Sequence, residues 1–295
     1  MRHIAFIGFG EAARAFAQSL REVAPVNITA YDILIHGDQA APLRAATEGL
    51  GVTLAQSAAE AIAGADLVFS AVTAGSAASA LLAPYAAPVH PHVLCDINSV
   101  TAACKAANAR LVRAAGAAYV DMAVMAPVHP ARHRTPVLLA GDVAAAEPAL
   151  RALDFRYDIA GPNPGDATAV KMVRSLFVKG LEALTVQTLA AAEASGCGDR
   201  ILASLHTSYP GLNLPEFAAY QFDRVVTHGR RRAEEVREVA QTLRDLGFAE
   251  GAALADGVAD VQAAVAAARP TLDPDPRICS RATAAALRPP ISGAA

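Results

Sequence analysis

Short apolar segments alternate with longer amphipathic ones through the first half of the chain. The short segments predict strands at His3–Phe9, Asn27–Tyr31, Val52–Ala55, Leu67–Val72, Val93–Ile97, Ala118–Val124, Val137–Ala140 and Arg156–Ile159. Alanine-rich stretches with helical spacing lie between most of them, at Glu11–Val23, Gln39–Gly49, Ser57–Ala63, Thr101–Ala115 and Ala144–Leu153. Strands that alternate with helices usually form a parallel sheet covered on both faces. This half of the chain is therefore predicted to be an α/β domain with a doubly wound, Rossmann-type parallel sheet.

The pattern changes after the proline- and glycine-rich segment Gly161–Gly165. A long helix is predicted at Asp166–Ala194, with Asp166 as its cap, and a charged helix at about Phe222–Leu246. No convincing strand follows, and the segment from about residue 270 carries five prolines, so an irregular tail is expected there. We therefore expect an α/β domain over 1–162 and an all-helical domain over 163–295.

Composition and charge exclude several classes of partner. Aromatic residues make up only 5% of the chain, tryptophan is absent and the net charge is −3, so we expect no nucleic-acid partner.

The four cysteines are scattered without Cys-x-x-Cys spacing, which is typical of a reduced, cytoplasmic protein. The uncharged stretch Leu67–Cys95 is interrupted by glycine and prolines, so we expect no membrane segment. His129 and His133 are separated by proline, and no metal site is expected.

A glycine-rich turn joins the first predicted strand to the first predicted helix. Gly8 permits a tight turn, Gly10 lets the backbone approach a pyrophosphate, and the helix that follows offers free N–H groups. Such a motif alone is weak evidence, but its place at the first strand of a βαβ unit strengthens it. An ordinary tight turn is the alternative. The residues expected to bind a dinucleotide here are Gly8, Phe9, Gly10, Glu11 and Ala12.

Asp32 ends the second predicted strand, 24 residues after Gly8. A carboxylate at this place accepts hydrogen bonds from both ribose hydroxyls of NAD and repels the 2′-phosphate of NADP. No arginine lies in Ile33–Gly37 to bind that phosphate. NAD is therefore the expected cofactor, with NADP as the alternative.

Several segments together resemble the β-hydroxyacid dehydrogenase superfamily, which includes 3-hydroxyisobutyrate and 6-phosphogluconate dehydrogenases. In the first half they are Ile7–Gly10, Asp96–Val100, Asp121–Gly141 and Gly161–Ser175. The second half is similar to a poorly characterised branch of that superfamily, in Lys171–Ser175, Lys179–Ala183, Ser208–Pro210, and His228 with Arg231–Glu234. The resemblance implies a nicotinamide cofactor, hydride transfer and contacts to the cofactor from Ala71, Val72, Asn98 and Ser99. Loop turns with self-bonded side chains are the alternative for the last two.

The resemblance also implies that Lys171 is the general acid/base. An ordinary lysine, with a pKa of ~10.4, is a poor base at neutral pH, but burial beside a cationic ring would lower that pKa. Ser175 stands where the family carries an asparagine, one helical turn further on the same face. The alternative is that Lys171 pairs with a carboxylate on a solvated helix.

The substrate loop departs from the family. Its usual Ser-Gly-Gly sequence, which binds a carboxylate, is replaced by Met125, Ala126 and Pro127. We therefore expect a substrate that is not a plain small 3-hydroxy acid and that contacts Met125, Ala126, Lys171, Ser175 and Tyr209. The lysine also argues against an imine reductase.

The expected function is NAD(P)-dependent hydride transfer between nicotinamide and a hydroxyacid-like or related alcohol or carbonyl compound. The alternatives are an oxidative decarboxylase of the 6-phosphogluconate type, for which no phosphate site is evident, and a dinucleotide-binding protein without activity. We expect the alanine-rich helical half to have too few bulky side chains to close its own core, which predicts a homodimer.

Overall fold

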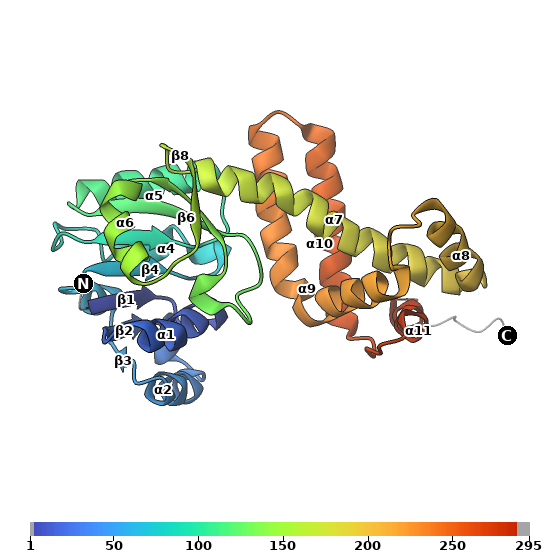
Figure 1. Cartoon of the computed structure of the whole chain (residues 1–295), viewed down its shortest axis with the longest axis horizontal. Helices are drawn as coiled ribbons and strands as arrows, with labels where there is room; N and C mark the ends of the chain where they lie inside the picture. The colour runs from blue at the N-terminus through green and yellow to red at the C-terminus, as the bar shows by residue number, and fades with distance from the viewer. Residues whose placement is uncertain (1–2, 288–295) are drawn as a thin grey trace. The chain divides into compact units, whose positions relative to one another are not determined.

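The computed structural model describes residues 3–287, and its internal contacts divide the chain into two compact units. The first unit comprises Met1–Met172 and the second Val173–Ala295, with the change falling inside one long helix (Figure 1). The sequence-based division at residues 162 and 163 remains a prediction. None of the helices over residues 3–287 is long and apolar enough to span a membrane.

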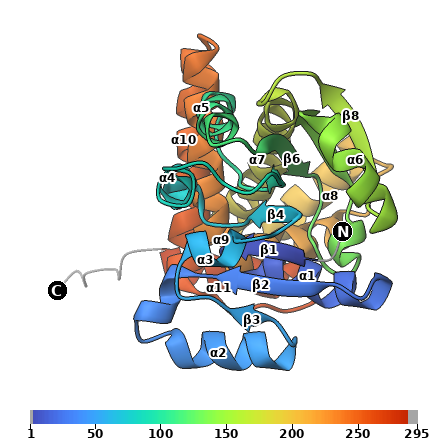
Figure 2. The ribbon, with the colours of Figure 1, turned by 90° about the vertical axis from the view of Figure 1, so that its left-hand side faces the viewer.

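The first unit contains one eight-stranded sheet of order β3-β2-β1-β4-β5-β6-β7-β8 (Figure 2). Its strands are β1 (His3–Ile7), β2 (Asn27–Tyr31), β3 (Thr53–Leu54), β4 (Leu67–Ser70), β5 (Val93–Asp96), β6 (Ala118–Val124), β7 (Val137–Gly141) and β8 (Tyr157–Gly161). The chain builds β1 to β3 in one direction and then returns to place β4 on the other side of β1, so the switch of direction lies between β1 and β4. The predicted Rossmann-type fold class is thereby confirmed.

One strand pair departs from the parallel sheet that the sequence predicts. β7 runs antiparallel to β6, whereas β7 and β8 are parallel. For two consecutive strands to be parallel, the connecting segment must cross back to the end of the sheet at which the first strand began, usually through a helix. The link between β6 and β7 contains only the short 3₁₀ turn Arg132–Arg134 among several prolines, and therefore returns antiparallel.

Helices cover both faces of the sheet because alternate strand residues point to opposite sides. Ile4 and Phe6 of β1 pack in one core cluster with residues of α1 (Glu11–Val23), α2 (Ala40–Gly49) and α6 (Val143–Ala152). Ala5 and Ile7 of the same strand belong to a second cluster. The helices contributing to this second cluster are α3 (Ala58–Ile62), α4 (Ser79–Leu82) and α5 (Ala102–Ala114).

The second unit is helical over its described residues. Its elements are the greater part of α7 (Asp166–Ala194), then α8 (Gly198–Ser208), α9 (Leu214–Asp245), α10 (Ala249–Ala268) and α11 (Pro276–Leu287). α9 and α10 form a closely packed pair (Figure 1), because Gly229 of α9 has no side chain where the Gln262 carbonyl of α10 approaches. Phe222, Val225 and Val265 form the centre of the core.

Two helix predictions in this unit are corrected. α9 begins at Leu214 instead of about Phe222, with Pro215 in its first turn. The tail expected to be irregular from about residue 270 contains α11. Pro276 is the first residue of that helix, where the missing N–H costs nothing, and the Asp275 carboxylate caps the helix by accepting from the Arg277 N–H at 2.9 Å. The prolines of this segment therefore do not exclude a helix, because Pro276 occupies the first helical position.

Buried charges join three helices of the second unit. Glu182 of α7, 1% exposed, accepts hydrogen bonds from Arg232 of α9 and from Gln262 of α10. Lys179 of α7 pairs with Glu235 of α9 at 2.6 Å. Two sequence segments that mark the poorly characterised branch thus supply Lys179, Glu182 and Arg232 to these contacts, whereas Glu235 and Gln262 lie outside those segments.

Candidate functional site

The residues predicted to bind cofactor and substrate in the first unit follow five strands. β1, β2, β4, β5 and β6 are mutually parallel, so their carboxyl ends lie at one edge of the sheet. Ligands of open α/β sheets bind at this edge, next to the switch of strand order. The predicted residues found there are Gly8–Ala12 after β1, Asp32 after β2, Ala71 and Val72 after β4, Asn98 and Ser99 after β5, and Met125 and Ala126 after β6.

The turn between β1 and α1 has the backbone of a phosphate cradle. Gly8 has φ +87°, and a Cβ there would overlap the Ala71 carbonyl and the Val72 side chain, so only glycine fits between β1 and β4. A Cβ at Gly10 would meet no atom within 4 Å, and Gly10 supplies no side-chain cap to α1. The N-terminus of α1 thus has no side-chain cap at Gly10, as expected of a helix end that binds a pyrophosphate. Phe9 is fully buried and offers only its backbone.

Asp32 lies against this turn. One of its carboxylate oxygens accepts from the Phe9 N–H at 2.8 Å, and the other accepts from the Leu34 N–H at 3.0 Å. Each oxygen keeps a further lone pair for a ribose hydroxyl. The exposed Ile33 and Leu34 follow directly and provide an apolar surface beside the carboxylate. Sequence reasoning missed Arg14, whose Nε donates to the Phe9 carbonyl at 2.9 Å and brings a cation to the turn.

Asn98 holds the ends of β4 and β5 together. Its Oδ1 accepts from the Val72 N–H at 2.7 Å and its Nδ2 donates to Ser70 Oγ at 2.8 Å, and the residue is 4% exposed. These contacts join the loop after β4, on which Val72 lies, to the loop after β5, on which Ser99 lies. A direct contact between Asn98 and a nicotinamide carboxamide stays a prediction.

Lys171 lies at the same edge of the first unit. It is half-buried on α7, and its Nζ donates to Ser99 Oγ at 2.8 Å. Met125 packs in a small apolar cluster with Ala167, one turn earlier on α7, whereas Ala126 is exposed. Loops after β5 and β6 therefore meet the first two turns of α7.

Two predicted site residues belong to the second unit. Ser175 is buried on α7, one helical turn after Lys171. Tyr209 follows the last residue of α8 and is 61% exposed. Their roles toward a substrate stay predictions.

A buried polar cluster beneath these loops was missed by sequence reasoning. Lys105, Asp96 and Asp121 are each 0% exposed, and Lys105 lies between the two carboxylates at 2.8 and 3.4 Å. Burial alone would lower the pKa of Lys105, but the charges and hydrogen bonds of both aspartates outweigh burial and raise it. Lys105 is therefore an ammonium at neutral pH. Nothing in the local sequence pattern distinguishes this lysine from a solvated one.

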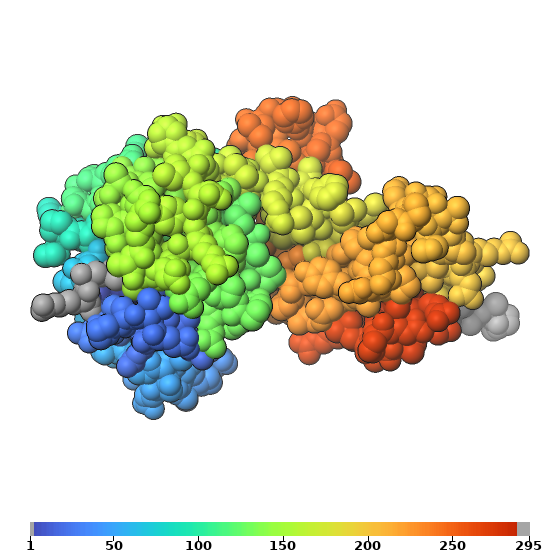
Figure 3. Space-filling view, in the orientation of Figure 1, coloured from blue at the N-terminus to red at the C-terminus, as the bar shows by residue number. Residues whose placement is uncertain are grey.

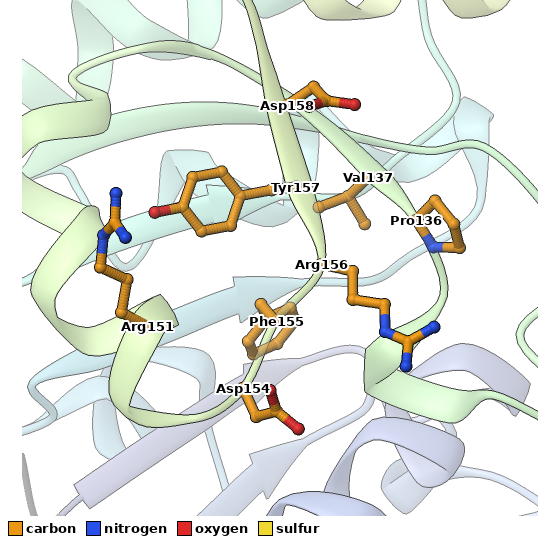
Figure 4. Close-up of a pocket in the computed structure, with 8 residues that line it drawn as sticks. All are labelled: Pro136, Val137, Arg151, Asp154, Phe155, Arg156, Tyr157 and Asp158. Carbon is orange, nitrogen blue, oxygen red and sulfur yellow. The ribbon is translucent and has the colours of Figure 1, made fainter.

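A separate hollow of about 680 Å³ lies along β8, the edge strand of the sheet (Figure 4). Three of its polar side chains bind neighbouring residues: Arg151 and Tyr157 both bind Glu147, and Asp154 pairs with Arg134. None of the predicted site residues lines it. Among residues 3–287, no group of three or more histidine, cysteine, aspartate or glutamate side chains is placed to hold a metal ion.

Residues 3–155 match the family described as the NAD binding domain of 6-phosphogluconate dehydrogenase. The chain belongs to this family. Residues 192–265 match a domain of unknown function, DUF1932. The suspected superfamily and the nicotinamide dinucleotide cofactor are both confirmed, and the chain is of the NAD(P)-dependent oxidoreductase class.

Three relatives illustrate the similarity. A conserved hypothetical protein from Sinorhizobium meliloti 1021 is 34% identical, with a TM-score of 0.73 and 97% of each chain covered. An uncharacterized 28.5 kDa protein of Methanothermus fervidus is 24% identical over 240 residues, 81% of this chain and 90% of its own length. The 3-hydroxyisobutyrate dehydrogenase of Mycobacterium tuberculosis shares the fold at 20% identity, with a TM-score of 0.73 over 95% of this chain and 98% of its own.

Proposed function

We propose that this protein is an NAD-dependent dehydrogenase or reductase that transfers hydride between nicotinamide and a small alcohol or carbonyl compound, with Lys171 as general acid/base. The observation that carries the proposal is the 2.8 Å contact from Lys171 Nζ to Ser99 Oγ, at the sheet edge that also holds the Gly8 turn and Asp32. The bound nicotinamide supplies or accepts the hydride. The residues of this chain must then bind the cofactor and move one proton.

The cofactor is held by the first βα unit. The backbone of Gly8–Ala12 and the N-terminus of α1 bind the pyrophosphate, and Arg14 adds positive charge near it. The two carboxylate oxygens of Asp32 accept the ribose hydroxyls. A 2′-phosphate would face this carboxylate at close range, so NAD is preferred over NADP.

Lys171 carries the proton. In reduction its ammonium donates a proton to the oxygen that becomes a hydroxyl, and in oxidation its neutral amine takes that proton. The hydrogen bond to Ser99 restricts where Nζ can lie, which supports an oriented transfer. Ser175, one turn further on α7, offers a second hydroxyl to the reacting oxygen.

The substrate is bound without the family's usual carboxylate clamp. Met125 and Ala126 offer a thioether and a methyl group after β6, where the family carries Ser-Gly-Gly. Met125 is half-buried against Ala167 and gives this side of the site an apolar wall. We therefore assign the protein a hydroxyacid-like or related carbonyl substrate with an apolar part.

The test compares Lys171→Met with the native protein and with Lys171→Arg, which keeps a cation but cannot release a proton at neutral pH. NADH affinity, measured by fluorescence titration, should be unchanged within about threefold, because the dinucleotide turn is untouched. Turnover on an active compound from an alcohol, ketone and imine panel should fall ~10²–10⁴-fold in both variants. A Lys171→Met protein with near-native turnover would contradict the proposed role.

We further propose that the protein forms a homodimer through its helical half. α7 exposes large apolar side chains at Val173, Phe177 and Leu184, with exposed fractions of 54–69%. The turn between α9 and α10 lies at the surface (Figure 3), and Leu246 and Phe248 of this turn are also exposed. Apolar faces of this kind are commonly covered by a second copy. Light scattering should give a molar mass of two chains for the native protein. In Phe177→Glu the molar mass should fall toward that of a single chain.

A further inference from the structure

Lysine is rare in this chain, and its three occurrences all lie away from open solvent. The 22 other basic residues are arginines, whereas the lysines are Lys105, Lys171 and Lys179. Lys105 is fully buried, Lys179 is 5% exposed and Lys171 is half-buried. Among the described residues the exposed cations are thus arginines, whereas the lysines lie in buried or half-buried positions.

Three acceptors surround the ammonium of Lys105. Its Nζ lies 2.6 Å from the Asp96 carbonyl, 2.8 Å from Asp96 Oδ1 and 3.4 Å from Asp121 Oδ1. An ammonium has three N–H donors, so these contacts match its full capacity. A guanidinium is larger and planar and would not fit the same three positions.

Asp96 connects Lys105 to the loop that carries Ser99. Its Oδ1 accepts from the Asn98 N–H at 3.0 Å, directly before Ser99. Its Oδ2 accepts from Tyr119 Oη at 2.7 Å and from Asn108 Nδ2 at 3.2 Å. Burial and the charge of Asp96 raise the pKa of Tyr119, which keeps its hydroxyl as a donor. This carboxylate is therefore held on both oxygens.

Asp121 connects Lys105 to the beginning of α7. Its Oδ2 accepts from the N–H groups of Gly165 and Thr168 at 3.1 and 2.9 Å, and its Oδ1 accepts from Thr168 Oγ1 at 2.8 Å. A carboxylate at this end of a helix also meets the positive end of the helix dipole. Lys171 follows Thr168 by three residues, within the next turn of the same helix.

Together with the contact from Lys171 to Ser99, these contacts form a closed ring that includes Lys105 and Lys171. From Lys105, one path leads through Asp96 and the Asn98 N–H to Ser99, and the other leads through Asp121 and Thr168 along α7 to Lys171. The 2.8 Å contact between Lys171 and Ser99 joins the two ends. All of these residues lie in the first unit.

We propose that Lys105 is a positioning residue for Lys171: its buried ammonium holds the Ser99 loop and the first turn of α7 at the separation that sets the Lys171–Ser99 contact. The catalytic consequence rests on the proposed role of Lys171, but the positional effect does not. Without the ammonium, two buried carboxylates would lie close together uncompensated, and one would have to take up a proton or move apart from the other. Either change shifts the loop or the helix start.

The test measures the position of Lys171 directly, without a substrate. Acetic anhydride at limiting concentration labels each lysine at a rate set by its accessibility and hydrogen bonding, and mass spectrometry reads the three lysines separately. Lys105→Met removes the ammonium but keeps an unbranched stem. Thr168→Val removes only the hydroxyl that Asp121 accepts, and Thr168→Ser restores it. Arg113→Met is the matched control, because Arg113 lies on the same helix α5 and pairs with Asp142 outside the ring at 2.8 Å.

We expect Lys105→Met and Thr168→Val to speed labelling of Lys171 by roughly fivefold or more, the factor that loss of one hydrogen bond implies. Thr168→Ser and Arg113→Met should stay within about twofold of native, and Lys179 should label at its native rate in every variant. The proposal is overturned if a folded Lys105→Met protein labels Lys171 at the native rate, or if Arg113→Met speeds labelling as much. Should Lys105→Met fail to fold, a native rate in Thr168→Val overturns it.

Turnover measurements test the catalytic role of Lys171, whereas the labelling rates test the positioning role of Lys105. If Lys171 is the acid/base, Lys105→Met should lower kcat by ~10-fold while NADH affinity changes little. If Lys171→Met proves fully active, the proposed function fails, yet the labelling rates still decide whether Lys105 positions Lys171.

Discussion

Removing Arg232 should destabilise the helical unit far more than removing a surface arginine from the same helix. Glu182 is 1% exposed, and Arg232 donates to it through Nε at 2.7 Å and through its terminal nitrogen. In Arg232→Met the Glu182 carboxylate keeps the 3.0 Å hydrogen bond from Gln262 but has lost its charged partner. A buried charge that loses its partner costs about 3–5 kcal/mol in the free energy of unfolding.

The same helix offers a matched control. Arg237 pairs with Asp260 of α10 at 3.3 Å, but its side chain is 52% and that of Asp260 72% exposed. Arg237→Met should therefore cost at most about 1 kcal/mol. The double variant Glu182→Met with Arg232→Met removes both charges and should recover most of the loss, because no unpaired charge remains.

Urea denaturation followed by far-ultraviolet circular dichroism measures these differences, with the three variants and the native protein compared under one condition. The reasoning would be refuted if Arg232→Met shifted the free energy of unfolding no more than Arg237→Met. It would equally be refuted if the double variant were less stable than Arg232→Met alone.

Three further predictions concern the first unit. Gly10→Ala should change the free energy of unfolding by no more than about 0.5 kcal/mol, because its Cβ enters space that no protein atom occupies. The same Cβ should weaken NADH binding at least tenfold in fluorescence titration, and native NADH affinity in this variant would contradict the phosphate cradle. Gly8→Ala should instead lower the free energy of unfolding. Asp32→Ser should raise the affinity for NADP relative to NAD by roughly tenfold in calorimetry, since a repelling charge is removed; an unchanged ratio would count against Asp32 as the discriminating residue. Burial lowers the pKa of His133 from 6.5, so the unfolded chain takes up the proton first and the free energy of unfolding should fall as the pH drops below about 6.5. His133→Gln should flatten this part of the curve of stability against pH. An unaltered slope in that variant would exclude His133 as the source of the pH dependence.

Local patterns were sufficient for much of the fold. The strand positions of the first unit and most of its helix positions follow from apolar periodicity, although α4 was not among the predicted helices. Helix Asp166–Ala194 has the bounds that the sequence predicts. The Gly8 turn and Asp32 were also found from sequence, because each is defined by its place at a strand end. The resemblance to a known family located Lys171, whose partner Ser99 was predicted as a neighbour of the cofactor and not of the lysine.

Only the tertiary structure decided which charges are buried and with whom. Lys105 stands on an amphipathic helix where a solvated lysine would give the same pattern, and Asp121 meets Thr168 across 47 residues of sequence. The antiparallel direction of β7 and the helix after Pro276 likewise depend on where the chain is packed and capped. Periodicity reports which face of an element is apolar, because that depends on neighbouring residues alone. The pairing of buried charges depends on which elements meet in space, and this is set by the packing of the whole unit.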